Sequence, residues 1–327
     1  FATLRFLTTR AKWDVARGLL AVRRDYRKRR DLDRITMLDW LREKKQGEQA
    51  IERFWRQVLV SAVNEELDRM AAIHGLQVFW LGFLARGDSY EMGIPNVPLG
   101  DLYSDDAWKQ HPEITLRERA TVEHVEFEGN SAVSLRVGGE NLLADVFISS
   151  VPFDRLNTFA LDLSIDVSAF SHSPITGIHL WFAEPITDLP HATLLNRTIQ
   201  WMFNKENGRH IQLVVSASRS LTEMPRQEVI ALGLRELSEF FPRAASVKLE
   251  RSHVVKEVRA TFSAGANLEA LRPPSTTRFA NFFLAGDWTR SSWPATMEGA
   301  VRSGYLAAEA ACRYLGRPQK FLVPDIA

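Results

Sequence analysis

The sequence predicts an α/β or α+β protein, and three patterns along the chain support that class. Apolar residues recur at helical spacing near the amino terminus, and they alternate with polar residues at the period of a strand in the middle. Near the carboxyl end a short apolar strand directly precedes a long helix that is rich in small residues. The 327 residues, 45% hydrophobic and 25% charged, are enough for one large or two medium cores.

Residues 1–85 are expected to be helical. Thr36 is expected to cap a helix that starts at Met37 and is stopped by Gly47, because Thr and Gly favour these positions. The longest apolar run, 78–85, is shorter than the roughly 20 residues of a membrane span. The patch 76–84 is expected either to be buried among the helices or to touch a membrane surface.

The basic stretch that begins at Arg23, "RRDYRKRRDLDR", allows two interpretations. It can be the solvated face of a helix, or it can contact lipid head groups. The sequence alone does not decide between them.

Strands are expected after residue 93, where turn residues become frequent. An antiparallel meander should start near Thr115, turn at 128–130 and 138–140, and end in a buried strand, Val146–Ser149. The further elements expected are strands at 175–183, 199–205, 210–218 and 247–262, and a helix at 226–241.

The carboxyl-terminal strand and helix form the most informative pattern. Asn281–Ala285 is an unbroken apolar run, so Asp287 falls at the carboxyl end of a covered strand, where open α/β sheets bind ligands. Pro294 and Thr296 mark the start of a helix that Gly316 ends, and its first N–H groups suit an electron-rich ligand. A βα unit that only packs tightly is the alternative. The small residues expected to let this helix approach its neighbour are Gly299, Ala300, Gly304, Ala307 and Ala308.

The segment 282–310, "FFLAGDWTRSSWPATMEGAVRSGYLAAEA", resembles the carboxyl-terminal flavin motif of the flavin amine oxidase and phytoene desaturase superfamily. It is most similar to the hydroxysqualene dehydroxylase branch. Other stretches, including "TMLDWL", "ERFWRQVLVSAVN", "GIPNVPLGDLY" and "PITGIHLWF", follow the order of that family over nearly the whole chain.

The resemblance implies an FAD/NAD(P)-binding Rossmann-like domain with an inserted substrate domain of mixed sheet and helices. The implied parts are a helical part of the substrate domain at 1–98, strands of the FAD domain at 99–155, the sheet and helix of the substrate domain at 156–274, the FAD-binding strand and helix at 275–316, and a tail at 317–327.

The resemblance also implies FAD as cofactor and assigns residues to it. Asp287 would accept a hydrogen bond from a ribityl hydroxyl or a bridging water, since a carboxylate repels a phosphate. Val122 would meet the adenine through its backbone, although an ordinary meander valine is the alternative. The implied cofactor-binding residues are Gly286, Asp287, Pro294, Ala295, Thr296, Met297 and Val122.

The implied reaction is reductive: the allylic hydroxyl of hydroxysqualene leaves and a hydride replaces it, giving squalene for hopanoid biosynthesis, with NADPH as the implied reductant. A carotenoid desaturase or an amine oxidase is the alternative enzyme. Arg259 and Arg272 could orient polar groups or lie on the surface. No acid, base or metal ligand is assigned. The residues expected along an apolar substrate tunnel, unless they only fill the core, are His179, Trp181, Trp201 and Phe203.

No G-x-G occurs in the chain, whereas members of this superfamily open with a strand and G-x-G-x-x-G that closes around the FAD pyrophosphate. We therefore expect an amino-terminal truncation, which agrees with a start at Phe1. A flavin-free lipid-binding or scaffold protein is the alternative from another class.

Charge and cysteine content constrain partners and compartment. A net charge of +1 gives no argument for nucleic-acid binding. Cys312 is the only cysteine, so no internal disulfide forms and a reducing compartment is expected. We expect a cytoplasmic protein that reaches the inner membrane surface for its hydrophobic substrate; the sequence does not indicate an oligomeric state.

Overall fold

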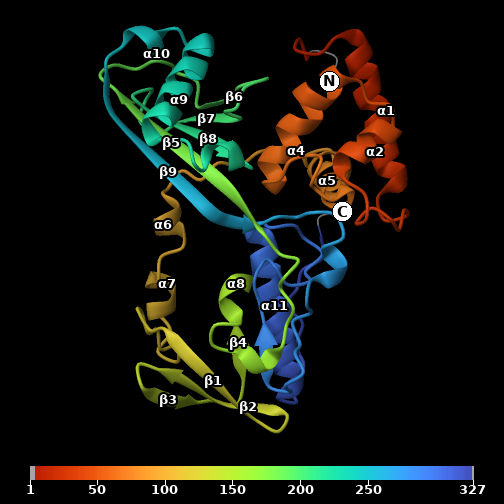
Figure 1. The fold of residues 1–327 in the computed structure, drawn as a ribbon, viewed down its shortest axis with the longest axis vertical. Helices are drawn as coiled ribbons and strands as arrows, with labels where there is room; N and C mark the ends of the chain where they lie inside the picture. Colours follow the sequence, from red (N-terminus) through yellow and green to blue (C-terminus); the bar gives the residue numbers. More distant parts are fainter. Residues whose placement is uncertain (1–3, 326–327) are drawn as a thin grey trace.

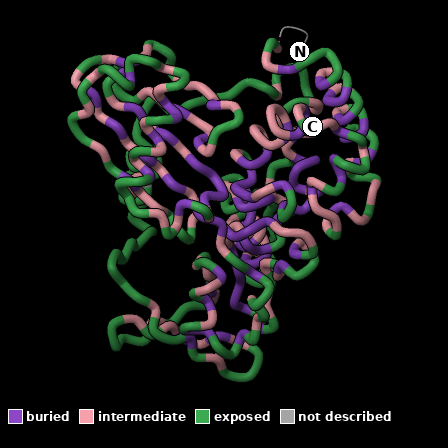
Figure 2. The backbone as a smooth tube through the Cα atoms, turned by 45° about the horizontal axis from the view of Figure 1, so that its top comes forward, coloured by how far each residue is buried: buried purple, intermediate pink, exposed green. Residues whose placement is uncertain are grey.

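A computed structural model describes residues 4–325, and in it three groups of elements meet at a common centre (Figure 1). Amino-terminal helices form the first group, a five-stranded sheet with its covering helix the second, and the carboxyl-terminal helix with two small sheets the third. Buried backbone concentrates where the three groups join (Figure 2). The mixed α/β class is confirmed.

The amino-terminal part is mainly helical, but the prediction of helix throughout 1–85 is wrong at 26–36 and 64–71, where turns connect the helices, and residues 1–3 lie outside the described chain. Thr36 caps its helix by accepting a hydrogen bond from the backbone N–H of Asp39. That helix ends at Glu43 and not at Gly47, because Lys45 takes a left-handed φ of 54° and turns the chain earlier. The elements are α1 (Thr9–Asp25), α2 (Met37–Glu43), α3 (Glu48–Ala50), η1 (Ile51–Trp55), α4 (Arg56–Val63), α5 (Ala72–Phe79) and η2 (Trp80–Leu84).

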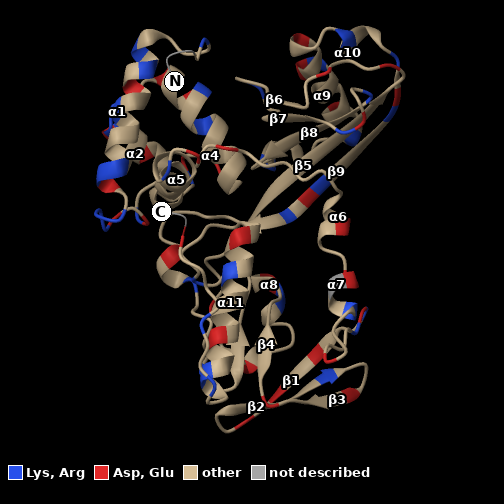
Figure 3. Ribbon diagram, turned by 180° about the vertical axis from the view of Figure 1, so that it is seen from behind, with Lys and Arg blue, Asp and Glu red and all other residues tan. Residues whose placement is uncertain are grey.

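The basic stretch after α1 is partly paired with acidic side chains. Arg29 contacts Asp31 at 2.6 Å and Glu43 at 2.7 Å, and Arg24 contacts Asp25 at 2.9 Å. Figure 3 shows acidic residues next to the basic ones in this part of the chain. Within residues 4–325, no helix combines the length and the apolar character that crossing a membrane requires.

The second group is an antiparallel sheet with the strand order β6-β7-β8-β5-β9. Helix α9 (Arg226–Phe240) covers one face, and the absence of a side chain at Gly233 allows this, because a Cβ there would lie 3.2 Å from Ile178 Cδ1. The opposite face carries His179 and Trp181 of β5. The remaining elements are β5 (His172–Phe182), β6 (His191–Thr193), β7 (Trp201–Asn204), β8 (His210–Ser216), β9 (Leu249–Phe262) and α10 (Arg243–Ser246).

The third group contains the predicted meander and a parallel strand pair. The meander consists of β1 (Val122–Glu128), β2 (Ser131–Val137) and β3 (Glu140–Leu143), so its first strand starts later than predicted. Strands β4 (Phe147–Ser149) and β10 (Phe282–Leu284) pair in parallel, and α11 (Met297–Tyr314) packs on β10.

Burial of this strand pair is uneven. All three residues of β10 are buried, as predicted. In β4, Phe147 is buried but Ile148 is 49% exposed, so the prediction of a buried strand there is only half right. The physical reason is that Phe147 and Ile148 point to opposite faces of the strand, and only one face packs on the main core.

Short helical turns complete the structure. They are α6 (Leu99–Leu102), α7 (Asp106–Lys109), α8 (Phe153–Leu156), η3 (Leu161–Leu163), η4 (Arg219–Leu221) and η5 (Glu269–Leu271). Turns α6 and α7 lie in an extended segment, residues 86–121, which we call the strap. Most of its side chains are exposed, and Figure 1 shows it running apart from the rest of the chain.

The two larger hydrophobic cores share strand β9, and a third, small cluster lies between β10 and α11. The larger of these two cores unites the helical group with the third group, and the other lies between α9 and the five-stranded sheet. Strand β9 contributes Phe262 to the first and Val254 to the second.

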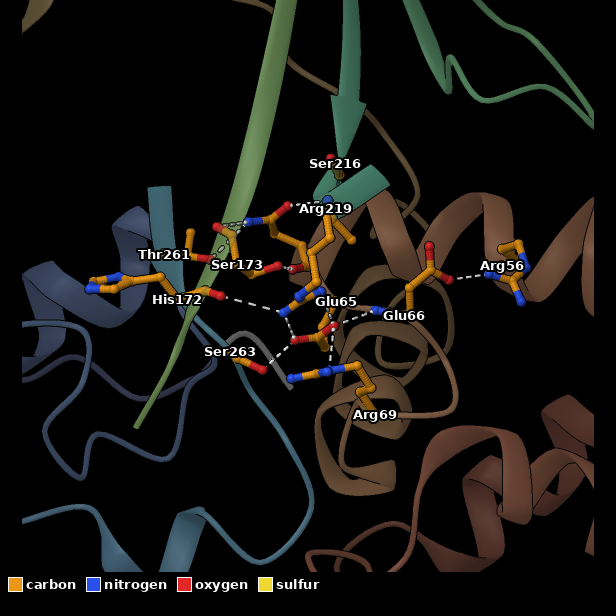
Figure 4. A network of polar contacts seen from close by, with 12 residues as sticks. Arg56, Glu65, Glu66, Arg69, His172, Ser173, Ser216, Arg219, Thr261 and Ser263 are labelled. Carbon is orange, nitrogen blue, oxygen red and sulfur yellow. Dashed lines mark hydrogen bonds and ion pairs between the residues drawn. The ribbon is translucent and has the colours of Figure 1, made fainter. Parts of the chain in front are cut away.

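A buried polar cluster, the Glu65 joint, links the helices to the sheet (Figure 4). Glu65 follows α4, is fully buried, and accepts two hydrogen bonds of 2.7 Å from Arg219. It also accepts one from the hydroxyl of Ser263, and Arg69 lies 3.6 Å away. Because the carboxylate is bound from both sides, it holds α4 against the ends of β8 and β9.

Candidate functional site

The turn after β10 requires a glycine. Gly286 has a φ of 120°, and a Cβ there would lie 2.8 Å from Trp288 Nε1. Its backbone N–H donates to Ser303 Oγ at 2.7 Å. Ser303 belongs to α11, so the turn is fixed directly to that helix.

Asp287 stands at the carboxyl end of β10, as predicted. Burial raises the pKa of its carboxyl group, and the positive charge of Arg272 partly opposes this. The backbone N–H groups of Asp287 and Trp288 also oppose the rise, because they favour the charged carboxylate. The protonated, hydrogen-bonding form is therefore favoured more strongly here than in water.

The start of α11 has free backbone donors. Thr296 caps the helix by accepting a hydrogen bond of 3.0 Å from Gly299 N–H. For the N–H groups of Met297 and Glu298, no acceptor is found among residues 4–325. These donors and the helix dipole favour an electron-rich group at this end.

A cavity of about 950 Å³ adjoins this turn. It is lined by Trp293, Pro294 and Thr296 at the start of α11, and by residues of the amino-terminal helices that include Val78 and Leu81. The second of these lies in the π-helical turn η2, an irregularity that proteins often place at functional sites. The wall is mixed, with more apolar than polar surface.

Arg302 adds a buried cation to the cavity wall. It is 8% exposed, and its guanidinium lies 3.2 Å from Asp325 and 3.3 Å from Glu298. Trp293 Nε1 donates to the same Asp325 carboxylate at 3.1 Å, while Arg302 Nε has no partner within the described chain. Hydrogen-bond donors therefore line the cavity on the side that α11 forms.

The face of α11 that packs differs from the predicted one. Gly299 and Ala307 are buried, and a Cβ at Gly299 would lie 2.6 Å from Pro294 O, so close approach is confirmed there. At Gly304 a Cβ would meet nothing within 4 Å, and Ala300 is exposed. The prediction is wrong for these positions, because Arg302 and Ser303 form the buried face with the glycine and alanines instead.

The predicted cofactor residues are placed as follows. Pro294 and Thr296 line the cavity. Four others are in or next to the same loop without lining it: Gly286, Asp287, Ala295 and Met297. Val122 begins β1 and is partly buried against the main core, and Val125 is the fully buried valine of that strand.

The predicted substrate residues lie on the face of the five-stranded sheet opposite α9, and they do not line the cavity. Trp181 stacks on His210 with ring centroids 4.3 Å apart, and Trp201 stacks on Phe203 at 5.6 Å. His179 Nδ1 is 3.0 Å from His210 Nε2. Burial, and then the neighbouring histidines, lower the pKa of His179, so its ring is neutral near pH 7.

The sequence allows either polar contacts or a surface position for Arg259 and Arg272. Arg259 is on the surface and pairs with Asp154 at 2.7 Å. Arg272 is fully buried beneath the loop that follows β10, so the surface alternative is wrong for it. The "LRP" around Arg272 gave no periodic signal that could have revealed this.

Sequence reasoning also missed His74. It is fully buried one turn before Gln77, a residue of the cavity wall. Burial, with the positive charge of Arg272, lowers the pKa of His74 to about 3, so it stays neutral. A lone histidine in an apolar helix gave no signal for this position.

The residues at this corner fit a flavin. The cavity volume is within the range of cofactor pockets, and the free N–H groups of Met297 and Glu298 can donate to an electron-rich ring edge. The Gly286 turn and the buried Asp287 offer a close backbone approach and a polar group beside it.

The α/β architecture and the βα corner agree with the class of flavin-dependent oxidoreductases, and comparison with known proteins shows the family. Residues 2–312 match the family described as flavin containing amine oxidoreductase, and the chain belongs to this family. Membership implies FAD as the cofactor.

The chain is similar to two groups of curated relatives. It is 35% identical over 137 residues to hydroxysqualene dehydroxylase of Sinorhizobium fredii. The aligned region covers 42% of this chain and 32% of that protein. It is 24% identical over 339 residues to a probable zeta-carotene desaturase of Synechococcus elongatus. The aligned region covers 90% of this chain and 70% of that protein. The chain thus spans about a third of the first relative's length.

A solved structure shows the same fold. Wild-type putrescine oxidase bound to putrescine superposes with a TM-score of 0.68 at 13% identity, over 94% of this chain and 76% of that one. At this identity the likeness extends to the fold alone.

Proposed function

We propose that the chain acts as an FAD-dependent oxidoreductase on a squalene-type isoprenoid, most specifically in the reductive dehydroxylation of hydroxysqualene to squalene. The observation that carries this proposal is the cavity of about 950 Å³, which is lined by Glu298, whose N–H is free, and by apolar residues such as Val78 and Leu81. The similarity to hydroxysqualene dehydroxylase of Sinorhizobium fredii supports the substrate class.

The residues of the chain would bind, orient and exclude water. The N–H groups of Met297 and Glu298 would hold the electron-rich edge of the flavin, and Asp287 would hold a hydroxyl of its side chain. Trp293 and Leu81 would keep water from the reacting carbon. When bound, the reduced flavin would supply the hydride that replaces the allylic hydroxyl, and the hydroxyl would leave as water after it takes up one proton from solvent.

The partners are part of the same proposal. NADPH would reduce the flavin, and the aromatic face with His179, Trp181, Trp201 and Phe203 would contact the isoprenoid chain. Because such a substrate dissolves in bilayers, we place the protein in the cytoplasm, in peripheral contact with the inner membrane surface.

A second candidate is carotenoid desaturation, which is favoured by the 90% of this chain that aligns with the zeta-carotene desaturase relative. The two reactions differ in the direction of electron flow. Dehydroxylation consumes a reductant, whereas desaturation delivers electrons to the flavin.

The test is product analysis after adding FAD to the purified chain. We expect squalene from hydroxysqualene only when NADPH or dithionite is supplied. Conversion of phytoene or zeta-carotene without a reductant would support the desaturase instead. Failure to bind FAD, combined with tight binding of squalene, would replace both with a flavin-free lipid-binding protein.

A further inference from the structure

Arg272 is a fully buried cation between η5 and β10. A buried guanidinium is very costly unless its donors are satisfied. Here the donors are satisfied almost entirely by one loop, residues 287–293, which runs from Asp287 to the start of the α11 turn. The acceptors are Asp287 O at 2.7 Å, Trp293 O at 2.7 Å, Trp288 O at 3.4 Å, Ser291 Oγ at 3.3 Å, Glu269 Oε2 at 2.5 Å, and the carbonyl oxygen of Thr289.

The loop contains no helix or strand. Its backbone N–H groups make three bonds: Thr289 N–H to Gly286 O at 3.0 Å, Arg290 N–H to Pro273 O at 2.8 Å, and Trp293 N–H to Ser291 Oγ at 3.4 Å. Its side chains add bonds from Trp288 to Val151 O and from Thr289 to Gly286 O, both of 2.9 Å, but none of these bonds satisfies the carbonyl groups that Arg272 binds. Four of its carbonyl groups converge on the guanidinium. Since carbonyl dipoles that point at each other repel without a cation between them, the conformation of the loop depends on Arg272.

The loop connects Arg272 to the cavity. The carbonyl that Nη1 binds belongs to Trp293, whose side chain lines the cavity and bonds to Asp325. The next two residues that line the cavity are Pro294 and Thr296, and the second of these caps α11. A shift of the loop would therefore move the free N–H donors of α11.

The charge of Arg272 is balanced locally. Glu269 pairs with it at 2.5 Å, and His74, 3.9 Å from that carboxylate, remains neutral. The guanidinium of Arg272 also lies over the ring of Phe262, with its Cζ atom 5.2 Å from the ring centroid. Lysine cannot replace it, because an ammonium offers three donors at one point and not a planar fork of five.

We propose that Arg272 is the positioning residue of the cofactor cavity: its guanidinium fixes loop 287–293, and through it the α11 turn, in the conformation that binds the flavin. This inference rests on the proposed flavin site and names the residue that shapes it.

The test uses the full chain with Arg272→Lys and Arg272→Ala, and Arg290→Lys and Arg290→Ala as matched controls. Arg290 belongs to the same loop, but it is exposed and makes one side-chain bond, to Ala270 O at 3.0 Å. FAD affinity is measured by quenching of flavin fluorescence. We expect it to fall about tenfold or more in the Arg272 variants and to stay within twofold in the controls.

Two further measurements separate positioning from general destabilisation. Millimolar guanidinium should restore FAD affinity to Arg272→Ala and leave Arg290→Ala unchanged. Hydrogen exchange of the chain without FAD should rise in residues 286–300 of Arg272→Lys, with circular dichroism and exchange in β5 unchanged.

The outcomes are distinct from those of the proposed function. If the wild-type chain binds no FAD, the flavin proposal fails, and the exchange measurement still decides whether Arg272 fixes the loop. Unchanged FAD affinity and unchanged exchange in Arg272→Lys would overturn the inference. Loss of protection throughout the chain, without guanidinium rescue, would show a structural role only.

Discussion

Gly286 and Gly304 lie in the same corner but have opposite surroundings. We expect Gly286→Ala to lower the free energy of unfolding by about 1–3 kcal/mol, because a Cβ would contact Trp288 and φ is 120°. Gly304→Ala should raise it by about 0.5–1 kcal/mol, because the position is helical and open. Urea unfolding of both variants measures the difference, and equal effects would contradict it.

The carboxyl group of Asp287 should make stability depend on pH. Its folded-state pKa is raised above the unfolded value of about 3.9, so the folded chain holds this proton more strongly. Stability is therefore fully present below that unfolded value and is lost as pH rises through the folded pKa. We expect Asp287→Asn to raise the melting temperature at pH 7 and to have little effect near pH 3.

The control for this prediction is Asp162→Asn, at an exposed aspartate, which should leave the melting temperature unchanged at both pH values. A gain for Asp287→Asn that is the same at pH 3 and pH 7 would show that titration of this carboxyl is not the cause.

At the residue scale, the sequence predicted positions where local chemistry is specific, and missed those that depend on distant contacts. Thr36 and Thr296 could be interpreted from capping preferences, whereas Gly286 was implied only by the family resemblance. The burial of Arg272 could not be predicted, because the carbonyl groups that surround it come from a loop 15–21 residues further along the chain.

Among the elements, the Glu65 joint carries the connection between the helices and the sheet. Arg219→Ala would leave a fully buried carboxylate without its two 2.7 Å hydrogen bonds. We expect a loss of about 3 kcal/mol in the free energy of unfolding. Adding Glu65→Gln should recover part of this loss, because the unpaired charge is removed.

The matched control is Arg197→Ala, which breaks a more exposed pair with Glu239. Its cost should stay below about 1 kcal/mol. Chemical denaturation of the variants measures both values, and a similar cost for Arg197 and Arg219 would mean that burial does not strengthen the joint.

Element types were easier to predict than the faces they bury. The long strand and helix patterns of β5, β9, α9 and α11 are where periodicity predicted them, because each repeats over many residues. The buried face of α11 was missed, since Arg302 and Ser303 pack inward through specific hydrogen bonds that composition does not indicate. For β4, an apolar run did not reveal that only one face packs.

At the scale of the whole molecule, the strap is the segment with the least support from the cores. Residues 86–121 are mostly exposed, including Tyr103 and Trp108, and their helical turns are four residues long. We expect limited trypsin digestion to cut here, at Lys109 for example, before it cuts the five-stranded sheet. Mass spectrometry of early fragments checks this, and a first cut in β5 or β9 would contradict it.

Strand β9 belongs to both of the larger cores, and this has a consequence for calorimetry. Strand β9 places Val254 in one core and Phe262 in the other. If either core loses its packing, β9 is displaced, and the other core loses its packing too. Heating should then give a single endotherm whose van't Hoff and calorimetric enthalpies agree, although the described residues form three separate clusters of buried side chains.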